Sequence, residues 1–460
     1  MSSRLALPLK APARPFAREL RAMVAIAAPL ALAQVGILAI NTTDVLMLGR
    51  LGPKALAATA LALSIFHPLL LFGIGIVTAT APLSAAAWGR RDLRGLRRVV
   101  RQGLWAAVPF TLLLSPVLFW LRPLLVGMGQ DPVLAGLAQD YMRGALWGLL
   151  PILAAVVLRT YLTTLGRPRA VLAISLAAIV LNAGLNYLLI FGALGIEGLG
   201  AFGAGLGSAI TNTVMALALI LHVAFRPPYR RHALFGRFWR PDWSTFRRIH
   251  RLGLPIGLSI VVEVSLFSGS AQLMGWIGTL ELAAHQIALQ LASITFMAPL
   301  GIGQAATARV GLAWGRGDKA GARQAGLAGM VLGFGFMACT AVLFAALPRT
   351  LANPFLGDGP EAAPVLAFAA TYITIAAAFQ LFDGLQVTAI SALRGLQDMT
   401  VPLLIAIVGY WLVGLGFGTT LAFAFDWGGR GIWTGMALGL AFMAVVLVHR
   451  FLRLTRLEGG

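Results

Sequence analysis

Long apolar runs, separated by short charged or Gly/Pro-rich segments, dominate this chain of 460 residues. Most runs approach or exceed the ~20 apolar residues that an α-helix needs to cross a bilayer. The pattern therefore predicts an all-α integral membrane protein with twelve transmembrane helices. The expected spans are residues 22–49, 56–88, 99–121, 133–165, 169–192, 200–225, 250–278, 281–313, 322–347, 362–394, 401–425 and 430–452.

The basic residues lie mostly in alternate loops. Of the 36 Lys and Arg, 29 fall in one set of loops and the termini, counted with the adjoining span ends, and only Arg143 and Arg159 lie inside spans and away from their ends. This asymmetry is the positive-inside pattern, so the net charge of +20 indicates topology and no nucleic-acid partner is expected. It predicts a multi-pass plasma-membrane protein, in the inner membrane if the source is a Gram-negative bacterium. Both termini are expected to be cytoplasmic.

The two halves of the chain resemble each other when the sequence is shifted by 226 residues. This register aligns Pro29 with Pro255, and it aligns Trp88-Gly89-Arg90 with Trp314-Gly315-Arg316. Six helices per half give a parallel repeat, which is typical of carriers, although a channel or a membrane enzyme could also arise by duplication. The expected domains are a tail (1–21), a first lobe (22–225), a basic linker (226–249), a second lobe (250–452) and a tail (453–460).

Three acids lie within apolar runs, where a charge is costly and usually functional. Glu263 and Asp383 belong to the second lobe. If they converge, their hard oxygens suit Na⁺, or a proton shared between two carboxylates. The alternative is a structural pairing with an Arg or a backbone group. Gln386, one turn from Asp383, is either a supporting ligand or an interhelical hydrogen-bond donor.

Asp44 is the acid of the first lobe, and its repeat partner is Ser270. Asn182 and Asn186 are four residues apart and share a helix face, so with Asp44 they could hold a proton or a cation. Alternatively, the asparagines only join helices. Thr211 is a weaker candidate for the same site.

Pro29 makes a bend in the first span easy, either as a hinge that responds to Asp44 or as a static kink. His285 lies near one end of its span, where a surface histidine is expected.

Motifs for ATP binding and for catalysis are absent. The sequence has no Walker A, HExxH, CxxC or Ser-centred nucleophile elbow, so no enzyme and no cofactor are expected. Energy is then expected from an ion gradient or the membrane potential.

Five segments together resemble the multidrug and toxic-compound extrusion (MATE) family, specifically its NorM branch. They are NTTDVLMLGRLG (41–52), LNAGLNYLLIFG (181–192), LPIGLSIVVEVSLF (254–267), AAHQIALQL with APLGIGQAATARVG (283–311) and FDGLQVTAISALRGLQDMTVP (382–402).

The resemblance implies a V-shaped fold of two pseudo-symmetric six-helix bundles. It also implies a monomer that exports organic cations, drugs and amphipathic toxic compounds by Na⁺- or H⁺-coupled antiport, with alternating access between the lobes. Glu263 and Asp383 match the cation site of the branch, whereas Phe379 stands where the branch has a tyrosine. Small-molecule substrates and membrane lipid are the expected partners. The alternative is a lipid-linked oligosaccharide or polysaccharide flippase of the same superfamily, which would require an Arg-rich central cavity.

Overall fold

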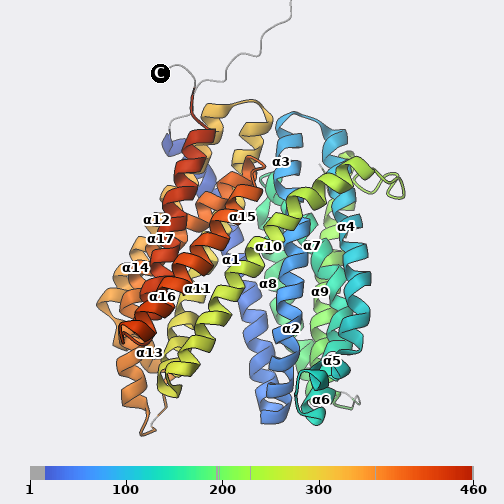
Figure 1. Ribbon diagram of the computed structural model, residues 1–460. Coiled ribbons are helices and arrows are strands. Elements are labelled where there is room, and N and C mark those ends of the chain that lie inside the picture. Colours follow the sequence, from blue (N-terminus) through green and yellow to red (C-terminus); the bar gives the residue numbers. More distant parts are fainter. Residues whose placement is uncertain (1–15, 193–194, 196, 228, 358, 458–460) are drawn as a thin grey trace, which may run out of the picture.

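Twelve helical segments of the computed structural model are long and apolar enough to cross a membrane (Figure 1). The structure describes residues 16–192, 195, 197–227, 229–357 and 359–457, and this part of the chain contains no β-strand. The predicted all-α, twelve-helix fold is thus confirmed.

The first lobe contains six spans and one short additional helix. Its helices are α1 (Phe16–Leu51), α2 (Pro53–Thr78) with α3 (Thr80–Gly89), α4 (Leu93–Phe119), α5 (Leu121–Gly127), α6 (Pro132–Ala145) with η1 (Leu146–Gly148) and α7 (Leu149–Thr164), α8 (Pro168–Phe191) and α9 (Gly200–Phe225). The turn η2 (Tyr229–His232) follows in the connection between the lobes.

The second lobe contains the other six spans, one of which is largely π-helical. Its helices are α10 (Trp243–Ile277), α11 (Thr279–Gly315), α12 (Lys319–Ala346), α13 (Pro348–Ala352) with η3 (Asn353–Phe355), α14 (Ala362–Gly395), α15 (Thr400–Ile407) with η4 (Val408–Gly416), α16 (Phe417–Thr419) and η5 (Thr420–Ala424), and α17 (Gly429–Leu454). The segments η4 and η5 are π-helices.

Several helices begin earlier than their apolar runs, because aspartates cap them inside the polar segments. The Asp92 carboxylate accepts from the Gly95 N–H at 2.8 Å, and that of Asp318 accepts from Gly321 at 2.7 Å. Asp242 likewise caps α10, which starts at Trp243 and not near residue 250. A cap contributes about 0.5–2 kcal/mol, enough to extend a helix beyond its membrane span. Asp92 and Asp318 are related by the 226-residue shift, so the repeat extends to the caps.

Buried side chains of α1 belong to the hydrophobic cores of both lobes, whereas those of α10 belong to the second-lobe core and to a small third cluster with α3 and α4. Leu48 packs in the first-lobe core, whereas Met23 and Leu30 pack in the core of the second lobe. Their repeat partners behave in the reverse sense: Ile249 and Ile256 pack against α3 and α4, and Met274 joins the second core. The beginning of the segment assigned to the first lobe therefore packs with the second.

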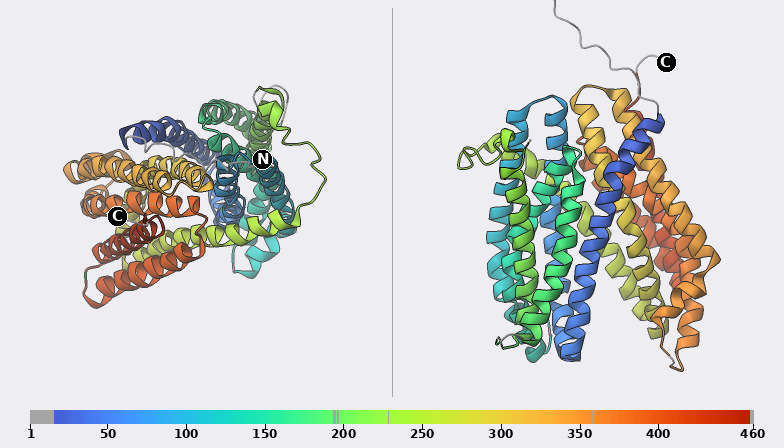
Figure 2. Two further views of the ribbon diagram at one scale, coloured as in Figure 1. Left: turned by 90° about the horizontal axis from the view of Figure 1, so that it is seen from above. Right: turned by 180° about the vertical axis from the view of Figure 1, so that it is seen from behind.

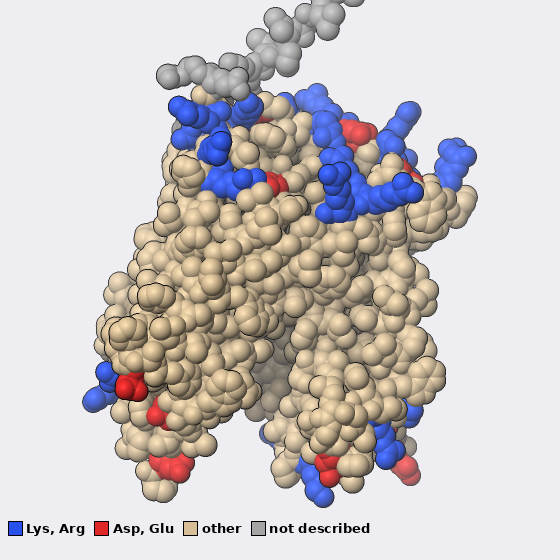
Figure 3. All heavy atoms as spheres, viewed as in Figure 1, with Lys and Arg blue, Asp and Glu red and all other residues tan. Residues whose placement is uncertain are grey.

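The ribbon views show how α1 and α10 cross between the lobes. Figure 2 shows α1 running obliquely from the second lobe towards the first, and Figure 1 shows α10 crossing in the opposite sense. Figure 3 shows most Lys and Arg at one end of the molecule, the Arg-rich end, and a hollow between the lobes at the opposite end. The lobes thus form the predicted V, closed at the Arg-rich end.

Glycines let the lobes meet backbone to backbone. A Cβ on Gly75 of α2 would lie 2.2 Å from the Gly257 Cα of α10. The repeat-related contact is the same, because a Cβ on Gly301 would lie 2.5 Å from the Ala31 N. The interface is therefore pseudo-symmetric, with matching close contacts on both sides.

An ion pair also fixes the beginning of α1 to α11 of the second lobe. Arg309 of α11 donates to both carboxylate oxygens of Glu19, through Nε at 2.5 Å and an Nη at 2.6 Å. Only 16% of the Arg309 side chain and 8% of the Glu19 side chain are exposed. This fork-like geometry is the strong, orientationally specific form of the interaction.

The valine variant Gly75→Val is expected to separate the lobes at the Arg-rich end, because its side chain would overlap backbone that cannot move aside locally. Overpacking of this kind costs about 1–3 kcal/mol. Spin labels at the exposed Arg90 and Arg316, in a Cys339→Ser background, should move apart in this variant. Gly335→Val is the control, because that position of α12 faces open space. An unchanged distance distribution in Gly75→Val would contradict the close-packing interpretation.

Candidate functional site

Asp44 is held in the first lobe by side chains from two other helices. Asn186 of α8 donates through Nδ2 to one carboxylate oxygen, and Ser208 of α9 donates to the other at 2.8 Å. The second N–H of Asn186 points to Asn182 Oδ1 at 3.4 Å. Both asparagines are fully buried, so the structure brings together the predicted acid and its two predicted amides.

The asparagine amides retain bonding capacity. Asn186 Oδ1 and Asn182 Nδ2 are buried and have no hydrogen-bond partner in the described part of the chain. An unpartnered oxygen beside a carboxylate is a suitable ligand for a cation, and an unpartnered N–H can donate to a polar ligand. This cluster therefore has an unused acceptor on Asn186 and an unused donor on Asn182.

Among the described residues, the Thr211 hydroxyl forms no hydrogen bond with Asp44. Its hydroxyl donates to the Gly207 carbonyl of its own helix at 2.8 Å. Ser208, three residues earlier, occupies the position facing the carboxylate, and the sequence analysis missed it. The apolar pattern of α9 does not distinguish which hydroxyl faces α1, because both positions lie on adjoining parts of one face.

The second lobe brings Glu263 of α10 and Asp383 of α14 close enough for their charges to interact. Asp383 is 6% exposed and Glu263 is half-buried. Among the described residues, neither carboxylate has a hydrogen-bond partner, in contrast to Asp44. Unpartnered carboxylates inside a membrane lobe call for a cation, a proton or water.

Two buried neutral oxygens are associated with this acid pair. Gln386 Oε1 and the Tyr410 hydroxyl have no hydrogen-bond partner in the described structure, and their side chains are 1% and 2% exposed. The charges of both acids act on the Tyr410 phenol, as does that of Arg394. Tyr410 and Arg394 were not predicted.

A π-helical segment carries Tyr410 to this position. The segment η4 packs on α10 beside Glu263, where Trp411 Nε1 donates to Ser265 Oγ at 3.1 Å. π-Helical turns are rare and frequently occur at functional sites. Within the described residues, no group of three or more His, Cys, Asp or Glu could hold a metal ion. Any cation here would be held by two carboxylates and neutral oxygens.

An aromatic wall lies next to the acid pair. Phe379, one turn before Asp383, contacts Phe267 and Trp433 with ring centroids 6.4 and 5.7 Å apart. Trp433 contacts His285 in turn, and His285 is fully buried. The expectation of a surface histidine was therefore wrong.

Ser270, the repeat partner of Asp44, satisfies one ring nitrogen of the buried His285. Ser270 donates its hydrogen to the Phe267 carbonyl at 2.9 Å, so its oxygen accepts from His285 Nε2 at 3.3 Å. Where the first lobe has a carboxylate, the second thus has a serine–histidine pair.

Pro29 lies within the continuous helix α1, next to the point at which α1 changes lobes. Leu30 still packs in the second-lobe core, whereas Ala33 packs in that of the first lobe. A bend at Pro29 would therefore alter how the lobes are connected.

Comparison with known proteins agrees with this architecture. The MatE family profile matches residues 29–188 and 255–420. The two matches begin 226 residues apart, which is the register of the internal repeat.

The chain is also similar over nearly its whole length to curated relatives. It is 46% identical over 437 residues to the probable multidrug resistance protein NorM of Rhizobium meliloti, covering 95% of this chain and 94% of the relative. It is 43% identical over 456 residues to the protein of the same name from Rhodopseudomonas palustris, covering 99% and 96%.

Solved structures share the fold. The crystal structure of the eukaryotic MATE transporter AtDTX14 superposes with a TM-score of 0.82 at 21% identity, covering 96% of this chain and 99% of that one. An outward-facing multidrug resistance MATE transporter gives 0.85 at 20% identity, covering 96% and 97%. The chain thus belongs to the MatE family of multidrug efflux transporters, within its NorM branch.

Proposed function

We propose that this protein is an ion-coupled antiporter that exports organic cations and other amphipathic toxic compounds. The observation that carries the proposal is the acid pair Glu263 and Asp383 inside the second lobe. No hydrogen bond or salt bridge of the described residues satisfies either acid, although the charge of Arg394 acts on Glu263. Carboxylates that the protein leaves unbonded can exchange one bound cation for another, which is the chemical requirement of antiport.

The Arg-rich end is the cytoplasmic end in this proposal, by the positive-inside rule. The hollow between the lobes in Figure 3 then opens to the outside of the plasma membrane. Rocking of the lobes about a central site would close this hollow and open the Arg-rich end. Multidrug substrates would bind between the lobes in one state and leave in the other.

The coupling ion is Na⁺ or H⁺. Na⁺ would be held by Glu263 and Asp383 with the neutral oxygens of Gln386 and Tyr410, because hard cations prefer oxygen ligands. A proton would instead be shared between the two carboxylates. In either case, entry of the cation from outside neutralises the site, and its release to the cytoplasm accompanies substrate export.

The first lobe supplies a second polar site in this proposal. Asp44, with Asn182 and Asn186, would bind a proton, a cation or a cationic substrate. Thr211 would be a weaker member of this site. Pro29 would act as the hinge through which the charge of Asp44 changes the path of α1.

A lipid-linked oligosaccharide flippase is not favoured. The curated relatives carry multidrug resistance names. Arg143, one of the two in-span arginines, lies over the Phe119 ring at 4.9 Å and so belongs to helix packing. Membership of a transporter family also gives no support to an enzymatic function. We expect the protein to be a monomer.

Efflux of a fluorescent cationic dye from proteoliposomes tests the proposal. Na⁺ and pH gradients are imposed separately, each with and without an ionophore that dissipates it. One gradient is expected to drive export, and its ionophore to stop it. Equal efflux under every condition would contradict ion coupling.

Removing the Tyr410 hydroxyl is expected to weaken binding of the coupling ion about tenfold or more, because a hydrogen bond or dipole contact to a charged group contributes about 1.5–3 kcal/mol. The measurement is the ion concentration that gives half-maximal dye efflux in Tyr410→Phe. Tyr372→Phe is the control. Tyr372 is equally buried, but the charges that act on its phenol are those of Glu281 and Arg430 and not those of the acid pair. Equal effects of the two variants would remove Tyr410 from the site.

A further inference from the structure

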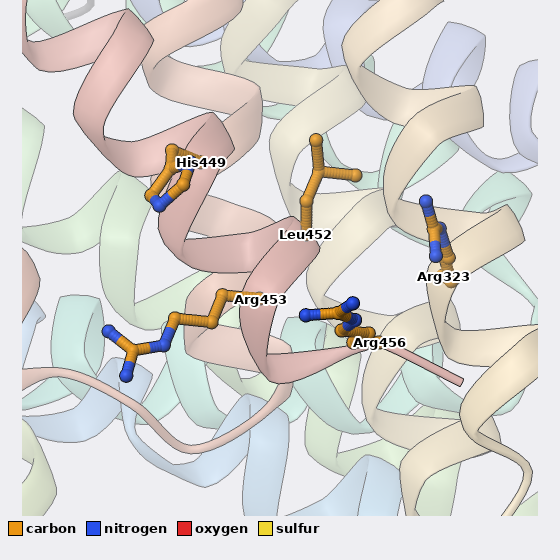
Figure 4. A pocket seen from close by; sticks show the side chains of 5 residues that line it. All are labelled: Arg323, His449, Leu452, Arg453 and Arg456. Carbon is orange, nitrogen blue, oxygen red and sulfur yellow. The ribbon is translucent and has the colours of Figure 1, made fainter. Parts of the chain in front are cut away.

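A basic pocket lies at the Arg-rich end between α12 and α17, outside the sites described above. It encloses about 490 Å³. Figure 4 shows Arg323 of α12 across a gap from Leu452 of α17 and from Arg456, which follows the end of α17, whereas His449 and Arg453 lie on the side of α17 farther from Arg323. Near the pocket, Gly326 of α12 accommodates the Phe451 ring of α17, since a Cβ there would lie 2.1 Å from it. The two helices thus pack closely next to a pocket with a basic rim.

The positive charge of this rim is not neutralised by the described protein. Arg323, Arg453 and Arg456 have no ion pair among the described residues. The neighbouring Arg450 differs, because it bonds Asp398 at 2.5 Å. Three unpaired guanidinium groups around one hollow make a site for an anion, and guanidinium suits phosphate oxygens.

Apolar faces run from this rim into the membrane. On α17, Leu438, Phe442 and Val445 are 42%, 37% and 66% exposed, and the spacing places them on the face that ends at His449. On α12, Val331 and Phe334 are 52% and 43% exposed. They lie eight and eleven residues after Arg323, on its side of the helix. A phosphate bound at the rim would therefore lie at the end of two exposed apolar stripes.

We propose that this pocket binds the phosphate headgroup of an anionic membrane lipid, with the acyl chains along the exposed faces of α12 and α17. The combination of basic rim and apolar stripes distinguishes a lipid from free phosphate, which has no use for the stripes. Basic pockets between transmembrane helices are known sites for anionic headgroups. The inference needs only the membrane setting of the family and is independent of ion coupling.

Native mass spectrometry of the full-length protein in detergent, titrated with phosphatidylglycerol or phosphatidylcholine, tests the proposal. The wild type is expected to bind phosphatidylglycerol in preference to phosphatidylcholine. The double variant Arg323→Gln/Arg456→Gln is expected to bind it roughly thirty-fold more weakly, from ~1 kcal/mol per arginine near a membrane surface. Arg230→Gln/Arg231→Gln is the matched control, because both residues are exposed in η2 and lie outside the pocket.

Two further arms separate the sources of phosphate. Soluble glycerophosphate in excess should displace little phosphatidylglycerol, and Val331→Ser/Val445→Ser should weaken lipid binding while the arginines remain intact. Because all four substituted side chains are at least partly exposed, the variants should keep the wild-type melting temperature without lipid. Equal losses in the pocket and control variants, or competition by glycerophosphate as effective as by lipid, would overturn the proposal.

Discussion

Replacing Asp383 by asparagine is expected to abolish dye efflux while leaving the protein folded in the membrane, and Glu263→Gln should do the same. Each change keeps the shape of the side chain but removes a charge that must bind and release the coupling ion. Without that exchange, neither a gradient nor the membrane potential, at ~2.3 kcal/mol per charge per 100 mV, can drive export. The measurement is efflux from proteoliposomes, with drug resistance of cells as a second readout.

Glu361→Gln is the control for loss of an acid, since this exposed residue precedes α14 outside the spans. It should retain wild-type efflux. If Asp383→Asn and Glu263→Gln both still protect cells fully, the coupling role assigned to the pair is wrong.

Breaking the Glu19–Arg309 ion pair is expected to have the second largest effect. Arg309→Met leaves Glu19 buried without a partner, and such a loss costs about 3–5 kcal/mol. That amount is at least comparable to the few kcal/mol that usually separate two conformations of a protein. The beginning of α1 should therefore detach from α11. Because α1 crosses between the lobes, this should loosen their closure at the Arg-rich end, and spin labels at Arg90 and Arg316 should report the separation while dye efflux falls.

The double variant Glu19→Leu/Arg309→Met removes both charges and should recover much of the closed population. Replacing a buried pair by apolar groups is often neutral, whereas removing one partner is not. A double-mutant cycle measures this coupling. Additive effects of the two single changes would show that the pair does not stabilise closure.

The repeat was the most informative feature of the sequence. The 226-residue register predicted two similar halves, and it now relates the caps at Asp92 and Asp318 and the glycine contacts at Gly75 and Gly301. The length of the apolar runs also located the spans, because a bilayer requires apolar length whatever the packing. Helix ends were less accurate, since a cap such as Asp242 lies outside the apolar run.

The pattern could not show which lobe an apolar residue packs against. Met23 and Leu48 look alike in sequence but lie in different cores, because α1 crosses between the lobes. An apolar face has the same periodicity whichever lobe it meets.

The charges of the candidate site were predicted, as were the amides Asn182, Asn186 and Gln386, but not Tyr410 or Ser208. An acid in an apolar run stands out, which is why Asp44, Glu263 and Asp383 were found. Tyr410 does not stand out, because a tyrosine in such a run normally packs as a hydrophobe, and its placement depends on the π-helical η4. Ser208 and His285 likewise depend on which helices meet, which a single sequence does not reveal.

Substrate-driven ion movement tests the central claim most directly. Proteoliposomes containing the wild type or Asp383→Asn are given a dye gradient but no ion gradient, and Na⁺ and pH are recorded inside. Because coupling is reciprocal in thermodynamic terms, dye leaving the wild-type vesicles should draw Na⁺ or H⁺ inward, and the variant should show no such flux. Dye movement at the wild-type rate without any movement of either ion would contradict the account.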